Sequence, residues 1–275
     1  MDINGLKGVV TGGAMGIGLA TARRLVGRGT RVDLWDINGE GLELAKHELV
    51  QAGGEVETHV VDVTDAAAVN AAAAGSVRLS GPVDILVNNA GYVRPGNFLE
   101  QPDAVWMKTV DVNLNGLLHT IRAFLPGMYE RDRGHVVNIS SAAGMLGVGG
   151  LSVYAATKWA VWGLTESMRF EAWSAGKTGV RWSSVHPCFI AEGMFSGAKL
   201  NPLGNLMIPL VKSHDVIAKA IVEDALVRGK YSPKRPVTLN LTVRLRGLLP
   251  DPLLQRMLIL FGVQRSMSTF RGRTP

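Results

Sequence analysis

A tyrosine and a lysine four residues apart, together with a serine at the end of a strand, are the residues in this sequence best suited to catalysis. Tyr154 and Lys158 fall in a segment predicted as a long helix over 153–175, and Ser141 follows a buried strand predicted at 136–139. A spacing of four residues places both side chains on one face of a helix, about one turn apart. A phenol, an ammonium and a hydroxyl would then meet where the strand ends.

This combination suits proton transfer. A phenol titrates near pH ~10, so it is a poor base at neutral pH. An ammonium about 4 Å away, at an effective dielectric of about 20, favours the phenolate by roughly 4 kcal/mol, which is about 3 pKa units. We therefore expect Lys158 to bring the pKa of Tyr154 towards neutrality. The same spacing also fits an interface aromatic beside a solvated lysine, because this pattern is frequent by chance.

Length and composition indicate one globular α/β domain. The chain has 275 residues, of which 47% are hydrophobic, enough for one substantial core over residues 1–275. Its single cysteine, Cys188, excludes an internal disulfide framework and fits a reducing, cytoplasmic compartment. We see no secretory signal at the start, and no apolar run approaches the ~18 residues of a membrane span.

The positive charge is concentrated near the end of the chain. Of the net charge of +6, residues 234–275 contribute eight Lys or Arg against one acid, Asp251, so residues 1–233 are close to neutral. The basic pI therefore does not indicate a nucleic-acid-binding domain. We expect a core at 1–233 and a basic, amphipathic extension at 234–275.

Two segments of that extension, 237–246 and 253–261, mix apolar residues with arginines. Helices that lie on anionic membranes have this pattern, so it predicts peripheral membrane contact. The alternative is that these apolar residues cover a substrate pocket or a subunit interface.

Strand and helix patterns alternate along the first 230 residues. Strands are expected at 8–11, 31–35, 55–61, 83–87, 136–139 and 180–185, and helices at 17–28, 39–51, 65–79, 103–130, 153–175 and 214–228. This alternation predicts a three-layer, doubly wound parallel sheet, the Rossmann fold, with a C-terminal helical extension. The helices at 103–130 and 153–175 carry more apolar residues than one sheet face needs, so we expect a homo-oligomer, a dimer or tetramer with an isologous interface.

A glycine-rich turn joins the first predicted strand to the first helix. Glycines at such a turn let the backbone approach a pyrophosphate, and the helix start supplies N–H groups and a positive dipole end. The turn places six residues near that ligand: Gly12, Ala14, Met15, Gly16, Ile17 and Gly18.

Polar residues also end the next strands. Asp36, followed by Ile37, ends the second strand, where an acid accepts hydrogen bonds from the adenosine ribose and repels a 2′-phosphate. Neither Met15 nor Ile37 is basic, so the pattern favours NAD over NADP, although Asp36 also fits a simple turn-starting acid. Two further strands end in polar or glycine-rich turns, at Asp62-Val63 and at Asn89-Ala90-Gly91.

At this point the chain strongly resembles the short-chain dehydrogenase/reductase family. The resemblance rests on TGGAMGIG at 11–18, Asp62-Val63, NNAG at 88–91, Asn113, Ser141 and the YxxxK motif. It implies hydride transfer between a nicotinamide and an alcohol or carbonyl carbon. It also implies that Tyr154 exchanges the hydroxyl proton and that Lys158 lowers the tyrosine pKa and holds the nicotinamide ribose. Ser141 would bind the substrate oxygen, and Asn113 would anchor a water; from the residues alone, Asn113 fits a polar cap at a helix break.

The sequence departs from the family after the sixth strand. The usual Pro-Gly is Pro187-Cys188, and a threonine expected two residues after Ile190 is Glu192. Pro187 and Ile190 remain expected cofactor contacts. Cys188 fits a small packing residue better than a nucleophile, since nothing nearby indicates an activated thiolate. The six histidines lack ligand spacing, so no metal site is predicted and His186 is interpreted as structural.

Apolar residues dominate three loops expected to wall the substrate pocket. Those expected to line it are Met145, Leu146, Leu151, Phe189, Met194 and Phe195. Such a lining favours an apolar alcohol or ketone over a sugar or an acid. The segment after 185 and the extension are also similar to retinol and hydroxysteroid dehydrogenases that act at membranes or lipid droplets.

The sequence therefore predicts an NAD-dependent oxidoreductase for a hydrophobic alcohol or its ketone or aldehyde. Two alternatives stay open. One is an NADPH-dependent 3-oxoacyl reductase, which Asp36 disfavours. The other is a non-catalytic NAD-binding or scaffold protein, which the presence of Asn113, Ser141, Tyr154 and Lys158 together disfavours.

Overall fold

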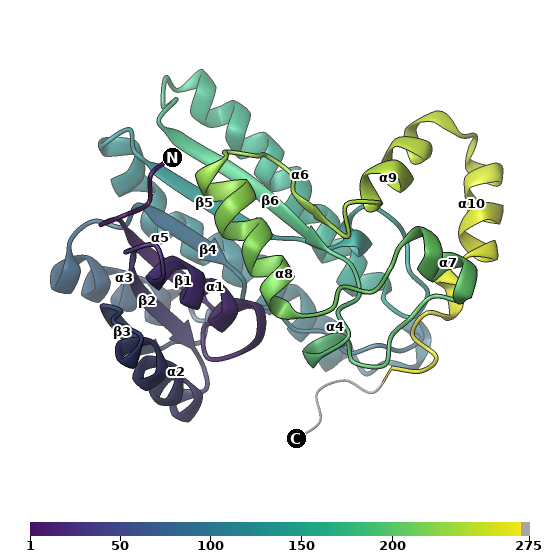
Figure 1. The fold of residues 1–275 in the computed structure, drawn as a ribbon, viewed down its shortest axis with the longest axis horizontal. Helices are drawn as coiled ribbons and strands as arrows, with labels where there is room; N and C mark the ends of the chain where they lie inside the picture. The colour runs from purple at the N-terminus through teal and green to yellow at the C-terminus, as the bar shows by residue number, and fades with distance from the viewer. Residues whose placement is uncertain (271–275) are drawn as a thin grey trace.

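A seven-stranded, fully parallel sheet forms the centre of the protein, as the computed structural model of residues 1–270 shows (Figure 1). Its strand order is β3-β2-β1-β4-β5-β6-β7. The strands are β1 (Lys7–Thr11), β2 (Arg31–Asp36), β3 (Val56–Val60), β4 (Ile85–Asn88), β5 (Gly134–Ile139), β6 (Val180–Pro187) and β7 (Lys234–Arg235). The order reverses between β1 and β4, so the carboxyl ends of these strands open onto a crevice where such sheets bind ligands.

Helices cover both faces of the sheet. One face packs against α1 (Gly16–Val26), α2 (Gly39–Gln51) and α8 (His214–Lys219). The other packs against α3 (Ala66–Ser80), α5 (Gly116–Glu130) and α6 (Ser152–Ser174). Adjacent strand residues serve opposite faces, as Val10 joins the first cluster and Val9 the second. The predicted three-layer Rossmann fold is confirmed.

Two segments predicted as single helices contain π-helical turns. The segment predicted at 103–130 consists of α4 (Asp103–Val110), the π-helical η2 (Asp111–Asn115) and α5. Likewise α8 continues into the π-helical η5 (Ala220–Val227). A π turn inserts a residue without interrupting the helix, and such turns are frequent at functional sites. Apolar periodicity does not reveal an insertion of this kind.

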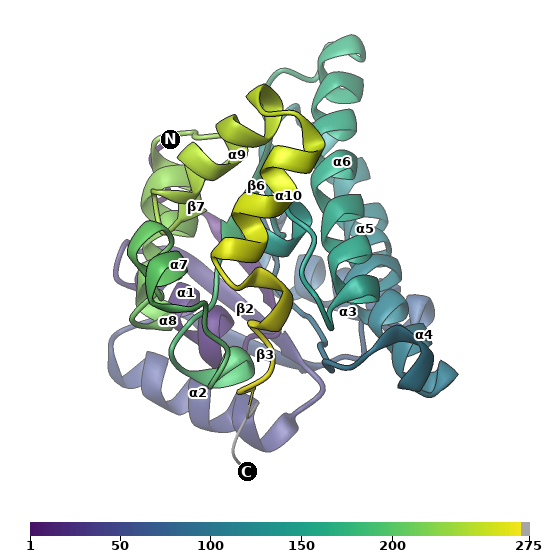
Figure 2. The same ribbon diagram turned by 90° about the vertical axis from the view of Figure 1, so that its right-hand side faces the viewer.

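The extension begins with the strand at one edge of the sheet. Lys234 and Arg235, just beyond the expected core boundary at 233, form β7 and pair with His186 and Pro187 of β6. The sequence did not predict β7, since a strand of two residues has no detectable period. The helices α9 (Leu239–Leu248) and α10 (Asp251–Leu260) follow, and Figure 2 shows α10 beside α7 (Pro202–Met207). Residues 271–275 of the extension, including Arg271 and Arg273, lie outside the described residues.

Short 3₁₀ segments complete the described chain: η1 (Phe98–Glu100), η3 (Ala142–Gly144), η4 (Gly193–Phe195) and η6 (Val263–Arg265). No helix within residues 1–270 combines the length and the hydropathy that crossing a bilayer requires.

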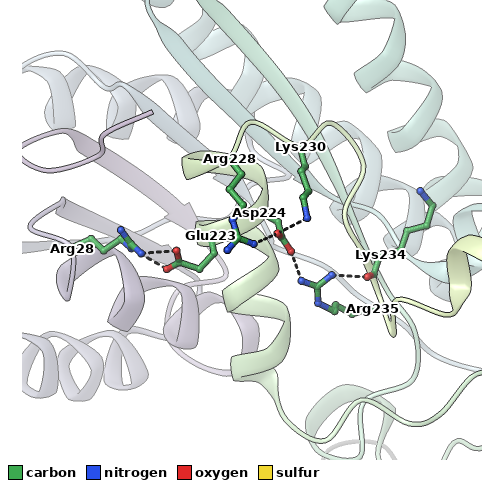
Figure 3. Close-up of polar contacts among 7 residues, drawn as sticks. All are labelled: Arg28, Glu223, Asp224, Arg228, Lys230, Lys234 and Arg235. Carbon is green, nitrogen blue, oxygen red and sulfur yellow. Dashed lines mark hydrogen bonds and ion pairs between the residues drawn. The ribbon is translucent and has the colours of Figure 1, made fainter.

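A buried carboxylate connects η5 to β7. Asp224 accepts hydrogen bonds from Arg228 (3.0 Å), from Lys230 (2.8 Å) and from Arg235 of β7 (Figure 3). Burial by itself would raise the pKa of Asp224, but the hydrogen bonds from Lys230, Arg235 and Arg228 outweigh it and lower that pKa to about 2. The cluster therefore holds the start of the extension on the sheet.

We predict that Asp224→Asn lowers the free energy of unfolding by about 3 kcal/mol, because it leaves the largely buried guanidinium of Arg235 without its carboxylate partner. Urea unfolding at pH 7 measures this. Since the pKa of Asp224 is depressed in the folded state, its contribution is present above its ordinary pKa of 3.8 and is lost as pH falls from 3.8 to about 2. Asp215→Asn is the control, because Asp215 forms an exposed pair with Arg24, worth about 1 kcal/mol or less. Equal losses in the two variants would contradict the prediction.

Candidate active site

The predicted tyrosine, lysine and serine lie together where β5 ends against the first turns of α6. All three side chains are buried. The Ser141 hydroxyl donates to the carbonyl oxygen of Pro187 (3.4 Å) and accepts from the backbone N–H of Ala143 (3.1 Å). The Lys158 ammonium donates to the carbonyl oxygen of Ile139 (2.9 Å) and lies 5.6 Å from the centre of the Tyr154 ring.

The electrostatics of this cluster differ from the expectation. Burial raises the pKa of Tyr154, and a hydrogen bond with Ser141 offsets only part of that rise. Burial also lowers the pKa of Lys158 to about 8. The expected lowering of the tyrosine pKa towards neutrality by Lys158 is therefore wrong for the polypeptide alone. Desolvation, which sequence spacing does not report, is the larger effect.

Ser140 and Ser141 have different surroundings. The Ser140 hydroxyl donates to the carbonyl oxygen of Lys158 (2.8 Å), so it ties α6 to the end of β5. Ser141 lines both the deep apolar cavity and the adjoining groove described below. Of the two serines, Ser141 is thus the one placed to meet a substrate in that cavity.

Asn113 lies buried in the π-helical η2 and holds the loop after β4. Its Oδ1 accepts from the backbone N–H of Tyr92 (2.7 Å), and its Nδ2 donates to the Tyr92 carbonyl (2.9 Å) and to the Thr157 hydroxyl (3.2 Å). A Cβ added at Gly91 would lie 3.4 Å from Asn113 Oδ1 and 3.9 Å from Lys158 Nζ. Asn113 therefore joins the Asn89–Gly91 turn to α6 beside Lys158.

The glycine turn before α1 packs closely against the end of β4. Gly12 and Gly16 have positive φ of 64° and 60°, a backbone conformation that favours glycine. The Asn89 amide donates to the carbonyl oxygens of Thr11 (3.0 Å) and Gly12 (3.1 Å). A Cβ at Gly18 would come within 2.0 Å of the Gly12 carbonyl. Side chains at Gly12 and Gly18 would push the turn apart, whereas at Gly16 the positive φ is what favours glycine.

The two acids at the ends of strands are fixed by local hydrogen bonds. The Asp36 carboxylate accepts from the backbone N–H groups of Ala14 (3.1 Å) and Asn38 (3.1 Å). The Asp62 carboxylate accepts from the backbone N–H (2.9 Å) and the hydroxyl (2.8 Å) of Thr64. Both acids face one groove.

This groove, about 1390 Å³ in volume, runs along the carboxyl ends of the strands and brings together most residues predicted to contact a cofactor. Those lining it are Gly12, Met15, Gly16, Ile17, Asp36, Ile37, Asp62, Val63, Asn89, Ala90, Gly91, Tyr154, Lys158, Pro187 and Ile190. Ala14 and Gly18 are buried within the turn and do not line the groove. A long groove with a glycine cradle and a ribose-side acid fits a dinucleotide.

A second, apolar cavity opens beside the groove. Among residues 1–270, the polar side chains that line it are those of Ser141 and Tyr154, besides the thiol of Cys188. Four residues predicted for the substrate pocket line it: Leu146, Leu151, Phe189 and Phe195. Met145 is fully buried in the adjoining hydrophobic cluster, and Met194 lines the groove, so neither borders this cavity as expected.

Sequence reasoning missed several cavity walls. Leu200 and Ile208 come from the loop region after β6, and Leu239 and Val263 come from the extension. Phe261 of the extension is also buried in the hydrophobic cluster beside this cavity. Part of the apolar surface of the extension, at Leu239 and Val263, thus packs over the cavity, which is one of the two alternatives left open. Only the amphipathic pattern of the extension could have indicated this, and it names no partner surface.

The residues that depart from the family pattern surround the same site. Burial raises the pKa of Cys188 to about 11, which keeps a neutral thiol. His186 is buried, with Nε2 2.9 Å from the Ser184 hydroxyl and Nδ1 3.4 Å from the Ser141 carbonyl oxygen. Burial lowers the pKa of His186 to about 3, so the ring is neutral. Within residues 1–270, no group of three or more His, Cys, Asp or Glu side chains is arranged to hold a metal ion.

Comparison with known proteins identifies the class. Residues 8–201 match the family described as short chain dehydrogenase. A short chain dehydrogenase/reductase from Burkholderia phymatum in complex with NAD superposes with a TM-score of 0.80 at 27% identity, covering 93% of this chain and 96% of that one. A metagenomic short-chain oxidoreductase in complex with NADP gives a TM-score of 0.69 at 34% identity, covering 82% and 92%.

The chain therefore belongs to the short-chain dehydrogenase family and is an oxidoreductase that acts on alcohol or carbonyl groups with a nicotinamide cofactor. Within the family it is similar to the human epidermal retinol dehydrogenase 2, with 34% identity over 243 residues, 88% of this chain and 77% of the relative. It is also similar to the human 17-beta-hydroxysteroid dehydrogenase 13, with 31% identity over 243 residues, 88% of this chain and 79% of the relative.

We predict that Lys158→Met stabilises the fold at pH 7 by about 2 kcal/mol, because burial disfavours the lysine charge. The pKa of Lys158 falls from 10.5 in the unfolded chain to about 8 in the folded one. The free-energy cost of burying the charged lysine is complete below pH 8. It shrinks as pH rises from 8 to 10.5, because in this range the folded lysine is neutral while the unfolded one is still charged. Urea unfolding at pH 7 and pH 9.5 should therefore show the advantage of Lys158→Met shrinking.

The control for this experiment is Lys219→Met, an exposed position on α8, which should change stability by less than about 0.5 kcal/mol at both pH values. An advantage of Lys158→Met that stays the same at pH 7 and pH 9.5 would show that the buried charge is not its source.

Proposed function

We propose that this protein is an NAD-dependent oxidoreductase that interconverts a hydrophobic alcohol and its ketone or aldehyde. The observation that carries the proposal is that Ser141 and Tyr154 line both voids, the groove suited to a dinucleotide and the apolar cavity. A substrate oxygen bound between these two hydroxyls would have its carbon facing the groove. Phe195 also borders both voids and packs edge-on against Tyr154, with ring centres 5.6 Å apart.

The four predicted catalytic side chains then have separate tasks. A bound nicotinamide supplies or accepts the hydride. Ser141 holds the substrate oxygen, and Tyr154 donates its proton to that oxygen in reduction; in oxidation the phenol first releases its own proton to solvent, and the phenolate then receives the proton of the alcohol. Burial keeps the phenol protonated, so Tyr154 is ready as a donor. Lys158 places a positive charge 5.6 Å from the ring and stabilises the phenolate that forms, while Asn113 positions the adjoining turn.

Asp36 supports NAD over NADP. Its carboxylate is held at the end of β2 by the N–H groups of Ala14 and Asn38 and faces the groove. A 2′-phosphate at this place would meet a negative charge, and the neighbouring Met15 and Ile37 supply no positive one. The same acid argues against an NADPH-dependent 3-oxoacyl reductase.

The apolar cavity supports a hydrophobic substrate. Apart from Ser141, Tyr154 and Cys188, its lining consists of aliphatic and aromatic side chains, so a sugar or an acid would lose hydrogen bonds to water without replacement. The names of the relatives, a retinol dehydrogenase and a hydroxysteroid dehydrogenase, suggest alcohols on extended apolar skeletons. We infer a substrate of this class.

The surface supports two further proposals about partners. On α6, Phe170 and Trp173 are 55% and 70% exposed, which supports an isologous homo-oligomer through this helix. A monomer in sedimentation at micromolar concentration would contradict it.

The outer faces of α9 and α10 support peripheral membrane contact. They expose five large apolar side chains beside exposed arginines: Leu241, Leu248, Leu253, Ile259 and Leu260. Anionic vesicles should bind the protein at low salt, and Leu248→Ser with Leu253→Ser should weaken binding. Leu44→Ser, on the exposed face of α2, is the matched control. Binding that survives the double substitution would rule this surface out.

We predict that Tyr154→Phe lowers turnover by at least ~100-fold, because it removes the proton donor but keeps the ring. The dissociation constant for NADH should stay within about threefold of the wild type. Steady-state kinetics and NADH fluorescence measure the two quantities. Turnover close to the wild-type rate would remove Tyr154 from the mechanism. If the wild type turns over no alcohol or ketone in a broad panel yet binds NAD tightly, the non-catalytic alternative gains support.

We predict that NAD binds the wild type more tightly than NADP does. Asp36→Ala should weaken the binding of NAD and strengthen the binding of NADP, so the two affinities should become more similar. The substitution removes the ribose acceptor for NAD and the repulsion for the 2′-phosphate of NADP. Titration of both proteins with both cofactors tests this. Equal affinity of the wild type for NAD and NADP would refute the role of Asp36.

A further inference from the structure

A glutamate and a histidine without an assigned role face the groove across from the glycine turn. Glu192, in the loop after β6, stands where the family resemblance leads us to expect threonine. Its Oε1 accepts hydrogen bonds from the backbone N–H of His214 (2.7 Å) and lies 2.9 Å from His214 Nδ1. Both residues line the groove together with Gly16. The pair therefore joins the loop to the first residue of α8 beside the expected cofactor.

The His214 ring is held between two glycines. Its Nε2 lies 3.7 Å from the position of a Cβ added at Gly16 and 2.6 Å from that of a Cβ added at Gly193. Gly193 also has a positive φ of 71°. A side chain at position 193 would thus displace the ring. With Nδ1 on Glu192, Nε2 is the ring nitrogen on the side of the glycine turn.

Ion pairs link α8 and η5, near this ring, to α1 and the turn that follows α1. Arg24 of α1 forms a two-point contact with Asp215, the residue after His214, at 2.7 and 2.6 Å. In the turn that follows α1, Arg28 forms a two-point contact with Glu223 of η5 (Figure 3). The glycine turn and His214 therefore belong to one rigid unit formed by α1, α8 and η5.

The start of α1 and its glycine turn are suited to a pyrophosphate, since helix N–H groups and the dipole favour an anion there. The Glu192 carboxylate lies on Nδ1 of the His214 ring, Nε2 lies beside the glycine turn, and an imidazolium ring can donate from both nitrogens. We propose that Glu192 and His214 form a clasp in which His214 Nε2 donates to the pyrophosphate of the cofactor and Glu192 orients the ring. This inference rests on the proposed cofactor groove.

The test separates the pyrophosphate from the rest of the cofactor. NADH, ADP-ribose and adenosine are titrated at pH 7 into the full-length wild type and its variants, with affinity measured by calorimetry. His214→Ala should lower the affinity for NADH and for ADP-ribose by about tenfold or more, which is the effect of losing one charge-assisted hydrogen bond. Adenosine, which lacks the pyrophosphate, should keep its affinity.

Further variants test the roles of the two residues. His214→Lys keeps a positive charge and should recover part of the lost affinity. Glu192→Gln should weaken NADH by a smaller factor, about threefold, because the amide still accepts from the ring but carries no charge. Lys212 is exposed and does not line the groove. Lys212→Ala is therefore the control for the loss of a distant positive charge, and it should leave the affinities for all three ligands unchanged.

Three outcomes would overturn the clasp. Unchanged affinity of His214→Ala for NADH and ADP-ribose would remove His214 from the site and leave the cofactor proposal intact. An equal loss of adenosine affinity would show a purely structural role. Failure of the wild type to bind either NADH or NADPH would overturn the cofactor groove and the clasp together.

Discussion

Desolvation where the groove meets the apolar cavity is the constraint on which the site depends. A phenol and an ammonium are buried there within one turn of α6, and each is pushed towards its neutral form. The structure counters this with a few directed contacts, the Ile139 carbonyl on Lys158 and the Ser141 hydroxyl beside Tyr154. In such surroundings, charges interact more strongly than they do in water.

Elements far apart in the chain bury this site. The loop after β6, α7 and the extension together close the cavity, with Leu200, Ile208, Leu239 and Val263 as its outer walls. The extension is held at its start by Arg235 on the buried Asp224. Near its end, the backbone N–H of Lys199 donates to the carbonyl of Ser266 (3.1 Å). The walls of the cavity therefore come from residues beyond the sheet as well as from Ser141 and Tyr154.

The sequence predicted those parts of the protein that repeat a short pattern. Alternating strands and helices gave the parallel sheet, and the glycine turn, Asp36 and Asp62 were placed on one groove because the carboxyl ends of parallel strands share an edge. What it did not predict has physical causes. A strand of two residues has no period, and a π turn leaves the apolar pattern continuous. The walls from the extension depend on contacts between distant segments. The raised pKa of Tyr154 depends on burial, which residue spacing does not encode.

Transfer of deuterium from the cofactor tests the central claim most directly. The protein is incubated with NADH deuterated at nicotinamide C4, in separate experiments for each face, and with a panel of apolar ketones; the products are analysed by mass spectrometry. We predict that one face delivers deuterium to the carbinol carbon of at least one product, leaving the oxygen proton to come from Tyr154. Alcohol products without deuterium from either face, or no alcohol from any ketone in the panel with NADH or NADPH, would contradict the account.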